Sequence, residues 1–284
     1  MYEDSDFRRN LRDLKMQPLY SKRTVILEDE GAARNSKNQL ETKKKYGIVT
    51  DLHIGFEERF KGSGVRIQTS AREMLEELES VVEENKLTDL VIAGDVKSGI
   101  DRILQSEWET VPKFLSSLSK KCRVEIVPGN HDGGLSNLVP ENVQLEDVNG
   151  ILISDSLIIH GHTRPLVKFG QCNRILMGHV HPIFQKRGSP LSGMPVWAFL
   201  KVKRKSIFPE LLLAEGIEEN PLLEVVLIPS FNLELASSGY AFETARAERR
   251  LSPIVKELKT AEEALVITLT GEVIGDESML SNVL

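Results

Sequence analysis

Six histidines gather in the middle of this 284-residue chain, and none occurs before residue 53 or after residue 181. They fall in four short motifs, Asp-Leu-His, Gly-Asn-His-Asp, His-Gly-His and Gly-His-Val-His, which contain His53, His131, His160, His162, His179 and His181. Histidines that only fill a core would not be expected to concentrate in this way. Imidazoles beside carboxylates and an amide are instead typical of a site that binds divalent metal and activates water.

Five apolar segments each end in a polar residue that can bind metal. The segments YGIVT, LVIAG, VEIVPG, LII and ILMG are followed directly by Asp51, Asp95, Asn130, His160 and His179, respectively. Active sites of α/β proteins gather at the carboxyl ends of strands, so five strand ends can bring these side chains to one place. A glycine precedes three of these residues, where it permits a sharp turn and leaves room for neighbours.

Two pairs of candidate ligands have a spacing of two residues. Asp51 and His53 form one pair and His179 and His181 the other, so at a strand end each pair should point one way. All candidate donors are nitrogen or oxygen, which favours manganese, iron, zinc, cobalt or nickel over calcium, magnesium or a structural cysteine site. Seven ligands suit two ions that share Asp95. Two metals about 3.5–4 Å apart are a recurrent arrangement for cleaving phosphate esters.

These blocks resemble, in order and identity, the five signature blocks of the calcineurin-like metallophosphoesterases. The matching residues are Asp51-Leu-His53, Gly94-Asp95, Gly129-Asn130-His131-Asp132, His160 and Gly178-His179-Val-His181. More narrowly, the chain resembles the archaeal SbcD-related phosphoesterases and the bacterial DNA-ligase-associated metallophosphoesterases. That narrower resemblance depends on Asp-Leu-His-Ile-Gly-Phe-Glu at 51–57, on the compact length, and on Ile-Pro-Ser-Phe at 228–231.

The resemblance implies a role for each matching residue. Asp51, His53, Asp95 and His181 would hold a first metal ion, and Asp95, Asn130, His160 and His179 would hold a second. A hydroxide that bridges the ions would attack phosphorus in line. His131 would lie near the phosphate or the leaving group, and Asp132 would orient its ring. The cofactor is then two divalent ions, with manganese preferred and iron, zinc, nickel or cobalt as alternatives.

The elements that must position these residues can be placed by pattern. We predict helices over 67–85 and 106–118, and strands over 22–28, 46–50, 90–93, 124–127, 151–153, 157–159, 175–177, 196–202, 223–228 and 264–269. The resemblance implies an α/β fold, a four-layer α/β/β/α sandwich of the metallophosphoesterase type. We expect one such domain over 23–254, an N-terminal arm over 1–22, and a C-terminal helix and strand over 255–284 packed on the same domain.

Composition excludes several classes of protein. Lysine and arginine number 36 against 42 acidic residues, a formal net charge of −6, which argues against a strongly basic nucleic-acid binder. No segment has the roughly 18–20 continuous apolar residues of a membrane span, and the charged N-terminus has no signal-peptide core. The two cysteines, Cys122 and Cys172, form no paired motif, so a cytoplasmic location is expected.

Several basic or imidazole side chains near the ligand motifs are candidates for substrate contacts. Arg59 follows the first ligand pair and can grip a substrate phosphate, or can be a solvated surface residue. The same two alternatives apply to Lys97 and Arg164, which lie beside ligand motifs. His162 either faces substrate or supports the site, unless it replaces His160 as the ligand.

These observations predict a metal-dependent phosphoesterase that favours phosphodiesters over monoesters, with a phosphate ester as its partner and no membrane. One alternative is a nuclease of DNA repair that binds nucleic acid, although the acidic charge argues against it. Another is a related enzyme that acts on a cyclic nucleotide, a nucleotide-containing lipid precursor or a phosphoprotein. The third alternative is a catalytically silent scaffold, and the presence of His131 argues against it. The oligomeric state is not predicted.

Overall fold

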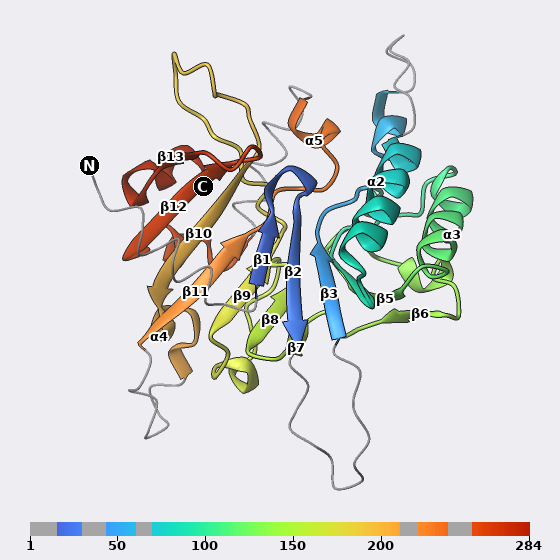
Figure 1. Cartoon of the computed structure of the whole chain (residues 1–284), viewed down its shortest axis with the longest axis horizontal. Coiled ribbons are helices and arrows are strands. Elements are labelled where there is room, and N and C mark those ends of the chain that lie inside the picture. Colours follow the sequence, from blue (N-terminus) through green and yellow to red (C-terminus); the bar gives the residue numbers. More distant parts are fainter. Residues whose placement is uncertain (1–15, 30–43, 61–69, 211–220, 238–251) are drawn as a thin grey trace, which may run out of the picture.

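Two β-sheets pack face to face in the computed structural model, which describes residues 16–29, 44–60, 70–210, 221–237 and 252–284 (Figure 1). The first sheet has six strands in the order of the chain. These are β1 (Met16–Leu19), β2 (Thr24–Asp29), β3 (Lys44–Val49), β4 (Asp89–Ala93), β5 (Arg123–Val127) and β6 (Val143–Leu145). Strands β1 to β3 pair antiparallel, whereas β3 to β6 are parallel, so β3, β4 and β5 end at one edge.

The second sheet has seven strands in the order β13-β12-β10-β11-β9-β8-β7. Its strands are β7 (Ile151–Ile153), β8 (Ser156–Ile159), β9 (Arg174–Met177), β10 (Val196–Lys203), β11 (Leu222–Leu227), β12 (Glu263–Thr268) and β13 (Val273–Gly275). Strands β8, β9 and β11 run parallel, and the other pairs are antiparallel. Strands β8 and β9 therefore also end side by side.

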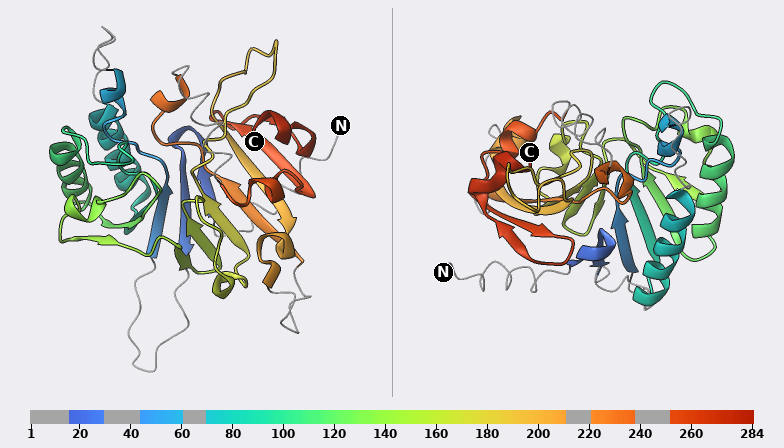
Figure 2. Two further views of the ribbon diagram at one scale, coloured as in Figure 1. Left: turned by 180° about the vertical axis from the view of Figure 1, so that it is seen from behind. Right: turned by 90° about the horizontal axis from the view of Figure 1, so that it is seen from above.

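Helices cover the outer faces of the two sheets. The helical segments are α2 (Ser70–Asn85), α3 (Glu107–Leu118), α4 (Arg204–Ile207), α5 (Glu234–Ser237), α7 (Val255–Leu258), η1 (Tyr20–Lys22), η2 (Phe56–Phe60), η3 (Leu135–Asn137), η4 (Val167–Phe169) and η6 (Glu277–Asn282). The view from above in Figure 2 shows α2 and α3 on one side of the molecule and the C-terminal segment on the other. No helix within these ranges is both long and apolar enough to cross a membrane.

Three apolar layers separate the four layers of secondary structure. The layer between the sheets contains side chains from both, such as Val91, Trp197 and Val226. A second layer joins the first sheet to α2 and α3, and a third joins the second sheet to α4, α7 and η6. The chain therefore has the predicted α/β/β/α sandwich.

Successive side chains along a strand point to opposite faces of the sheet, and this alternation produces the apolar layers. On β10, Trp197 and Phe199 face the other sheet, while Ala198 and Leu200 face the outer helices. All four are fully buried. A strand that is buried on both sides reads as a continuous apolar run, so the pattern predicts the strand but not which sheet contains it.

Both ends of the described chain contribute strands to the sheets. Met16–Leu19 forms β1, which pairs with β2, so the first sheet begins inside the segment 1–22 that we predicted as an arm. Strand β12 lies between β10 and β13, and thus the predicted C-terminal appendage completes the second sheet. The proposed division of the chain into segments otherwise stays a prediction, and the helical pattern that the sequence shows from residue 243 onward lies partly outside the described ranges.

On hydrophobic spacing alone, Trp108 would lie on the buried face of α3. Its side chain is 50% exposed, whereas Val111, Phe114 and Leu115 of the same helix are buried. In the first turn of α3 it is Glu107 that turns inward, because its carboxylate accepts hydrogen bonds from the backbone of the preceding loop. A charged residue thus takes an interior position that hydrophobic spacing assigns to its neighbour.

Candidate metal centre

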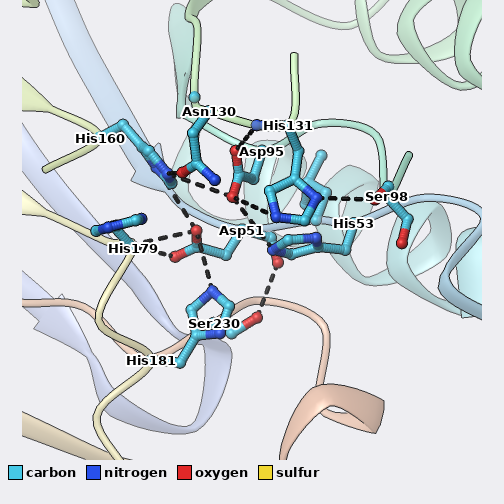
Figure 3. Close-up of polar contacts among 12 residues, drawn as sticks. Asp51, His53, Asp95, Ser98, Asn130, His131, His160, His179, His181 and Ser230 are labelled. Atoms are coloured by element: carbon cyan, nitrogen blue, oxygen red, sulfur yellow. Dashed lines mark hydrogen bonds and ion pairs between the residues drawn. The ribbon is translucent and has the colours of Figure 1, made fainter. Parts of the chain in front are cut away.

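The ends of five strands meet at one place, and each presents a candidate ligand. Asp51 follows β3, Asp95 follows β4, Asn130 follows β5, His160 follows β8 and His179 follows β9. Figure 3 shows the imidazole rings arranged around the Asp51 and Asp95 carboxylates. The loops after β3 and β4 are hydrogen-bonded, since the His53 amide donates to the Asp95 carbonyl at 2.8 Å.

Five of the candidate ligands have a left-handed backbone. Their φ angles are 57° for Asp51, 42° for His53, 48° for Asp95, 65° for His179 and 39° for His181. Such angles are uncommon outside glycine and cost of order 1–3 kcal/mol each, and they cluster at functional sites. The two pairs with a spacing of two residues thus reach the site through tight turns, not through the extended strand geometry that we predicted for them.

Two glycines leave the space that neighbouring ligands occupy. A Cβ atom on Gly94 would lie 1.9 Å from Nδ1 of His160, and a Cβ atom on Gly178 would lie 2.3 Å from Oδ2 of Asp51. Real Cβ atoms do not approach other heavy atoms so closely. Glycine before Asp95 and His179 is therefore required by the packing of the site itself.

The first group of candidate ligands comprises Asp51, His53 and His181, one ligand atom of each lying within 4.8 Å of the others. All three residues are buried. Nε2 of His181 is 3.3 Å from Oδ1 of Asp51. Asp51 also accepts hydrogen bonds from the His179 amide, at 3.1 and 3.3 Å, which ties the two ligand turns together.

The second group comprises Asp95, His160 and His179, again within 4.8 Å of one another and buried. Nε2 of His160 is 3.3 Å from Oδ2 of Asp95 and 3.0 Å from Oδ1 of Asn130. The same Asp95 oxygen lies 3.5 Å from Nε2 of His53 in the first group. Asp95 therefore lies between the two groups, as expected of a shared ligand.

His131 also lies within ligand distance of this centre. It forms a third group with His53 and Asp95, and its ring centroid is 4.7 Å from that of His53. Position alone does not distinguish a ligand from a side chain that acts on substrate. The role of His131 as a non-ligand therefore stays a prediction.

The ring of His131 is oriented by a backbone carbonyl and not by Asp132. Its Nδ1 lies 2.8 Å from the Ser98 carbonyl oxygen (Figure 3). The Asp132 carboxylate instead accepts hydrogen bonds from the amides of Gly129, at 2.8 Å, and Lys97, at 3.3 Å. The expected contact of Asp132 with the ring is thus wrong, because its carboxylate is occupied in holding the turn after β5.

Charges within the centre shift the pKa values of its members. Burial raises the pKa of Asp95, but the histidines around it outweigh this effect and hold it well below the usual range. Burial lowers the pKa of His160, but the Asp95 and Asp51 carboxylates raise it to about 9. For His179, burial and then His160 lower the pKa to about 3. The Asp95 carboxylate and the neutral His179 ring are therefore in the forms that bind cations, whereas His160 must release a proton when an ion binds.

The donors fit divalent ions. Both ring nitrogens of His53 and His179 and Oδ2 of Asp95 are buried and make no hydrogen bond within the described residues. Buried polar atoms normally have a partner, and leaving one without it is costly. Cations held by the two groups would give a partner to Oδ2 of Asp95 and to one ring nitrogen of each of these histidines, and a set of imidazoles with carboxylates suits manganese, iron or zinc.

Of the two predicted substrate contacts, the structure describes the side chain of His162 but not that of Arg59. His162 lies at the edge of the centre, with its ring centroid 5.1 Å from that of His160 and 6.1 Å from that of His179, and with Nδ1 unbonded within the described residues. It is outside the group that contains His160. Arg59 belongs to η2, but its side chain lies outside the described part of the structure.

Neither of the other two cations is placed to grip a phosphate. Arg164 donates to the carbonyls of Ile207 and Pro253 and pairs with Glu257 at 2.8 Å, which fastens α4 and α7. Lys97 is fully buried, and its ammonium group donates to backbone carbonyls. Both are structural contacts that the position in sequence does not reveal.

Two residues after β11 were not identified from the sequence. The hydroxyl of Ser230 donates to the Asp51 carbonyl at 2.8 Å, and the amide nitrogen of Asn232 donates to the Leu52 carbonyl at 3.0 Å. They hold the strained turn that carries the first ligand pair. The signal was available, since Ile-Pro-Ser-Phe-Asn follows a strand in the same manner as the ligands do.

The chain matches the calcineurin-like phosphoesterase family over residues 44–188, about half of its length. The DNA polymerase II small subunit of Pyrococcus furiosus is 23% identical over 210 residues, which cover 65% of this chain and 34% of that subunit. That of Pyrococcus horikoshii is 26% identical over 192 residues, covering 57% and 31%. The chain spans about a third of the length of these curated relatives.

This chain is also similar to proteins of known structure. Nuclease MPE of Pseudomonas putida is 20% identical, with a TM-score of 0.43, over 66% of this chain and 74% of that one. The phosphoesterase Yfce of E. coli is 21% identical, with a TM-score of 0.32, over 50% of this chain and 74% of that one.

Proposed function

This chain belongs to the calcineurin-like phosphoesterase family, and we propose that it is a phosphodiesterase that holds two divalent metal ions. The family supports a metal-dependent phosphoesterase. The observation that carries the proposal is that Asp95 lies between two buried groups of ligands, with His131 beside them. A single structural ion would need neither a second group nor a further histidine.

We assign the ligands as the resemblance implies. Asp51, His53, Asp95 and His181 would hold one ion, and Asp95, Asn130, His160 and His179 the other. The chemistry that two bound ions supply is charge neutralisation at the phosphoryl oxygens and activation of water at neutral pH. Manganese is our preferred metal, on the basis of the mixed imidazole and carboxylate donors.

His131 is the proposed proton carrier. Its Nδ1 faces the Ser98 carbonyl, so Nδ1 carries a proton and Nε2 is the atom directed toward the centre. Nε2 would stabilise a phosphoryl oxygen or give a proton to the leaving oxygen, a role that contributes typically 10²–10⁴-fold in rate. Asp132 acts indirectly, through the turn on which His131 lies.

Substrate contacts are proposed for His162 and Arg59. His162 lies beside the second group, where a phosphate ester held by the metals would reach it. Preference for a diester is supported by the Asp-Leu-His-Ile-Gly-Phe-Glu motif and by relatives named as DNA polymerase subunits. The same relatives make a nuclease acting on DNA the second candidate. A reducing, cytoplasmic site is supported by two free cysteines.

The test compares bis-p-nitrophenyl phosphate with p-nitrophenyl phosphate in Mn²⁺, and again after EDTA. Asp95→Asn, purified in parallel, controls for contaminating phosphatases, because it removes the shared ligand charge. We expect metal-dependent cleavage that prefers the diester and is lost in the control. Short single- and double-stranded DNA and cyclic nucleotides, in the same metal, then separate a nuclease from an enzyme of small diesters.

Two results would refute the proposal. Faster cleavage of the monoester would make the chain a phosphomonoesterase. Protein that is shown to hold two ions and cleaves neither compound, nor any of the panel, would favour a binding scaffold.

A further inference from the structure

Lys97 is a charged residue that the proposed chemistry does not use. It lies two residues after Asp95, and its side chain is fully buried. Lysine is almost never fully buried unless its charge is compensated, because removing an ammonium group from water is costly. Here the ammonium group donates to two backbone carbonyls, those of Gly99 and His131. The second bond joins Lys97 directly to the backbone of the proposed proton carrier.

The backbone of Lys97 is tied to the same turn. Its amide donates to Oδ1 of Asp132 at 3.3 Å, while Oδ2 of Asp132 accepts from the Gly129 amide at 2.8 Å. Two independent contacts therefore hold the loop after β4 against the loop after β5. His131 lies within the second loop.

A second buried charged residue, Glu107, holds the backbone amides of the segment that contains Lys97. The carboxylate of Glu107 is fully buried and accepts from the amides of Ser98, at 2.9 Å, Gly99, at 2.8 Å, and Leu104, at 2.7 Å. Lys97 thus binds a carbonyl of the 97–99 segment, and Glu107 binds its amides. Together they fix the direction of the carbonyl that lies between these contacts, which is that of Ser98.

The Ser98 carbonyl is the group that receives Nδ1 of His131 at 2.8 Å (Figure 3). We infer that Lys97 and Glu107 are positioning residues, which set the ring orientation and the tautomer of His131 so that Nε2 faces the substrate. This inference rests on the proposed function in giving His131 a role in turnover. The placement of the ring is independent of that role and can be measured separately.

The first measurement does not need activity. Long-range ¹H–¹⁵N spectra of histidine-labelled, zinc-loaded protein report which ring nitrogen carries a proton, and His131→Ala assigns the signal. Wild type should show His131 protonated at Nδ1. Lys97→Met, of similar length but without the donor, should shift this signal toward a mixture of tautomers. Lys113→Met is the matched control, because Lys113 is exposed and pairs only at 3.4 Å with Glu109 on the surface of α3.

The second measurement is a double-mutant cycle on turnover. Lys97→Met should retain two metals and an unchanged KM, while kcat falls at least about tenfold. This loss is part of the 10²–10⁴-fold in rate that proton transfer typically contributes. In the His131→Ala background the same change should have no further effect on kcat, because its target is absent. A residue that only stabilises the fold would reduce kcat in both backgrounds alike.

The outcomes are distinct. An unchanged His131 spectrum in folded Lys97→Met, or equal losses of kcat in the two backgrounds, would overturn the inference. A wild-type protein without phosphodiesterase activity would refute the proposed function, while the spectrum would still decide the positioning of the ring. If Lys97→Met does not fold, Glu107→Gln replaces it, since it keeps the shape of the side chain and weakens its hold on the same amides.

Discussion

Replacing Gly94 by alanine should damage the metal centre through sterics alone. Gly94 has φ of +92°, and an added Cβ would lie 1.9 Å from Nδ1, 2.2 Å from Cγ and 2.6 Å from Cβ of His160. Rotation of the ring cannot relieve all three contacts, because the His160 Cβ is itself too close. The end of β8, which is fully buried here, would have to move by about 1 Å for normal contact distances of about 3.5 Å.

The expected cost has two parts. A left-handed backbone costs a non-glycine residue about 1–3 kcal/mol. Overpacking of a well-packed interior adds about 1–3 kcal/mol. The sum, about 2–6 kcal/mol, is a large fraction of the 5–15 kcal/mol by which proteins are typically stable. Since His160 is a proposed ligand, displacement by this distance should also weaken binding of one ion at least about tenfold.

Gly193→Ala is the matched control. Gly193 has nearly the same φ, +94°, but an added Cβ would meet nothing within 4 Å. The control therefore carries the backbone cost without the clash. Urea denaturation of the two metal-free variants gives the steric contribution to the free energy of unfolding. Mass spectrometry of the metal-loaded variants gives their metal content. Equal stability of the two variants, with two ions bound to Gly94→Ala at wild-type affinity, would refute the reasoning.

Three further predictions concern other residues. His131→Ala should retain two metals and lose about 10²–10⁴-fold in kcat, whereas Asp95→Ala should lose metal; equal metal loss in both, measured by mass spectrometry, would show that His131 is a ligand. Arg164→Ala should lower the melting temperature without changing KM, because this side chain holds α4 and α7; a raised KM for the diester would assign it to substrate binding instead. Burial raises the pKa of both Cys122 and Cys172 to about 11, so only about one thiol in a thousand is ionised at pH 8. Native protein should therefore react slowly with iodoacetamide, at a rate that rises about tenfold for each pH unit up to 11, and rapid modification at pH 8 would contradict this pKa.

The sequence indicated which polar side chains gather at the site because their signal is local. Each candidate follows a short apolar run, and a strand that ends at a polar residue is visible without knowledge of the partner strands. The left-handed turns at Asp51 and His179 were not visible, since non-glycine residues adopt this conformation only when the surrounding structure imposes it. The sequence therefore indicated which residues meet, but not the backbone geometry through which they meet.

Long-range contacts explain what was missed. Strand β1 is four residues long and has no alternating pattern, so only its pairing with β2 reveals it. The roles of Lys97 and Glu107 depend on hydrogen bonds to backbone atoms, for which composition gives no sign. Asp132 follows the same rule, because a carboxylate beside a histidine in sequence need not contact its ring.

The order of strands in the second sheet has a consequence for synthesis. Strand β11 lies between β9 and β10 although it is made after both, and β12, which is made later still, pairs with the other edge of β10. A nascent chain that has left the ribosome as far as β10 already contains His160 and His179, but the edges of β9 and β10 have no partner strand. Unpaired strand edges of this kind favour aggregation, and chains that present them are bound by chaperones. Ser230 and Asn232, which hold the turn of the first ligand pair, can join the site only after β11 has been made.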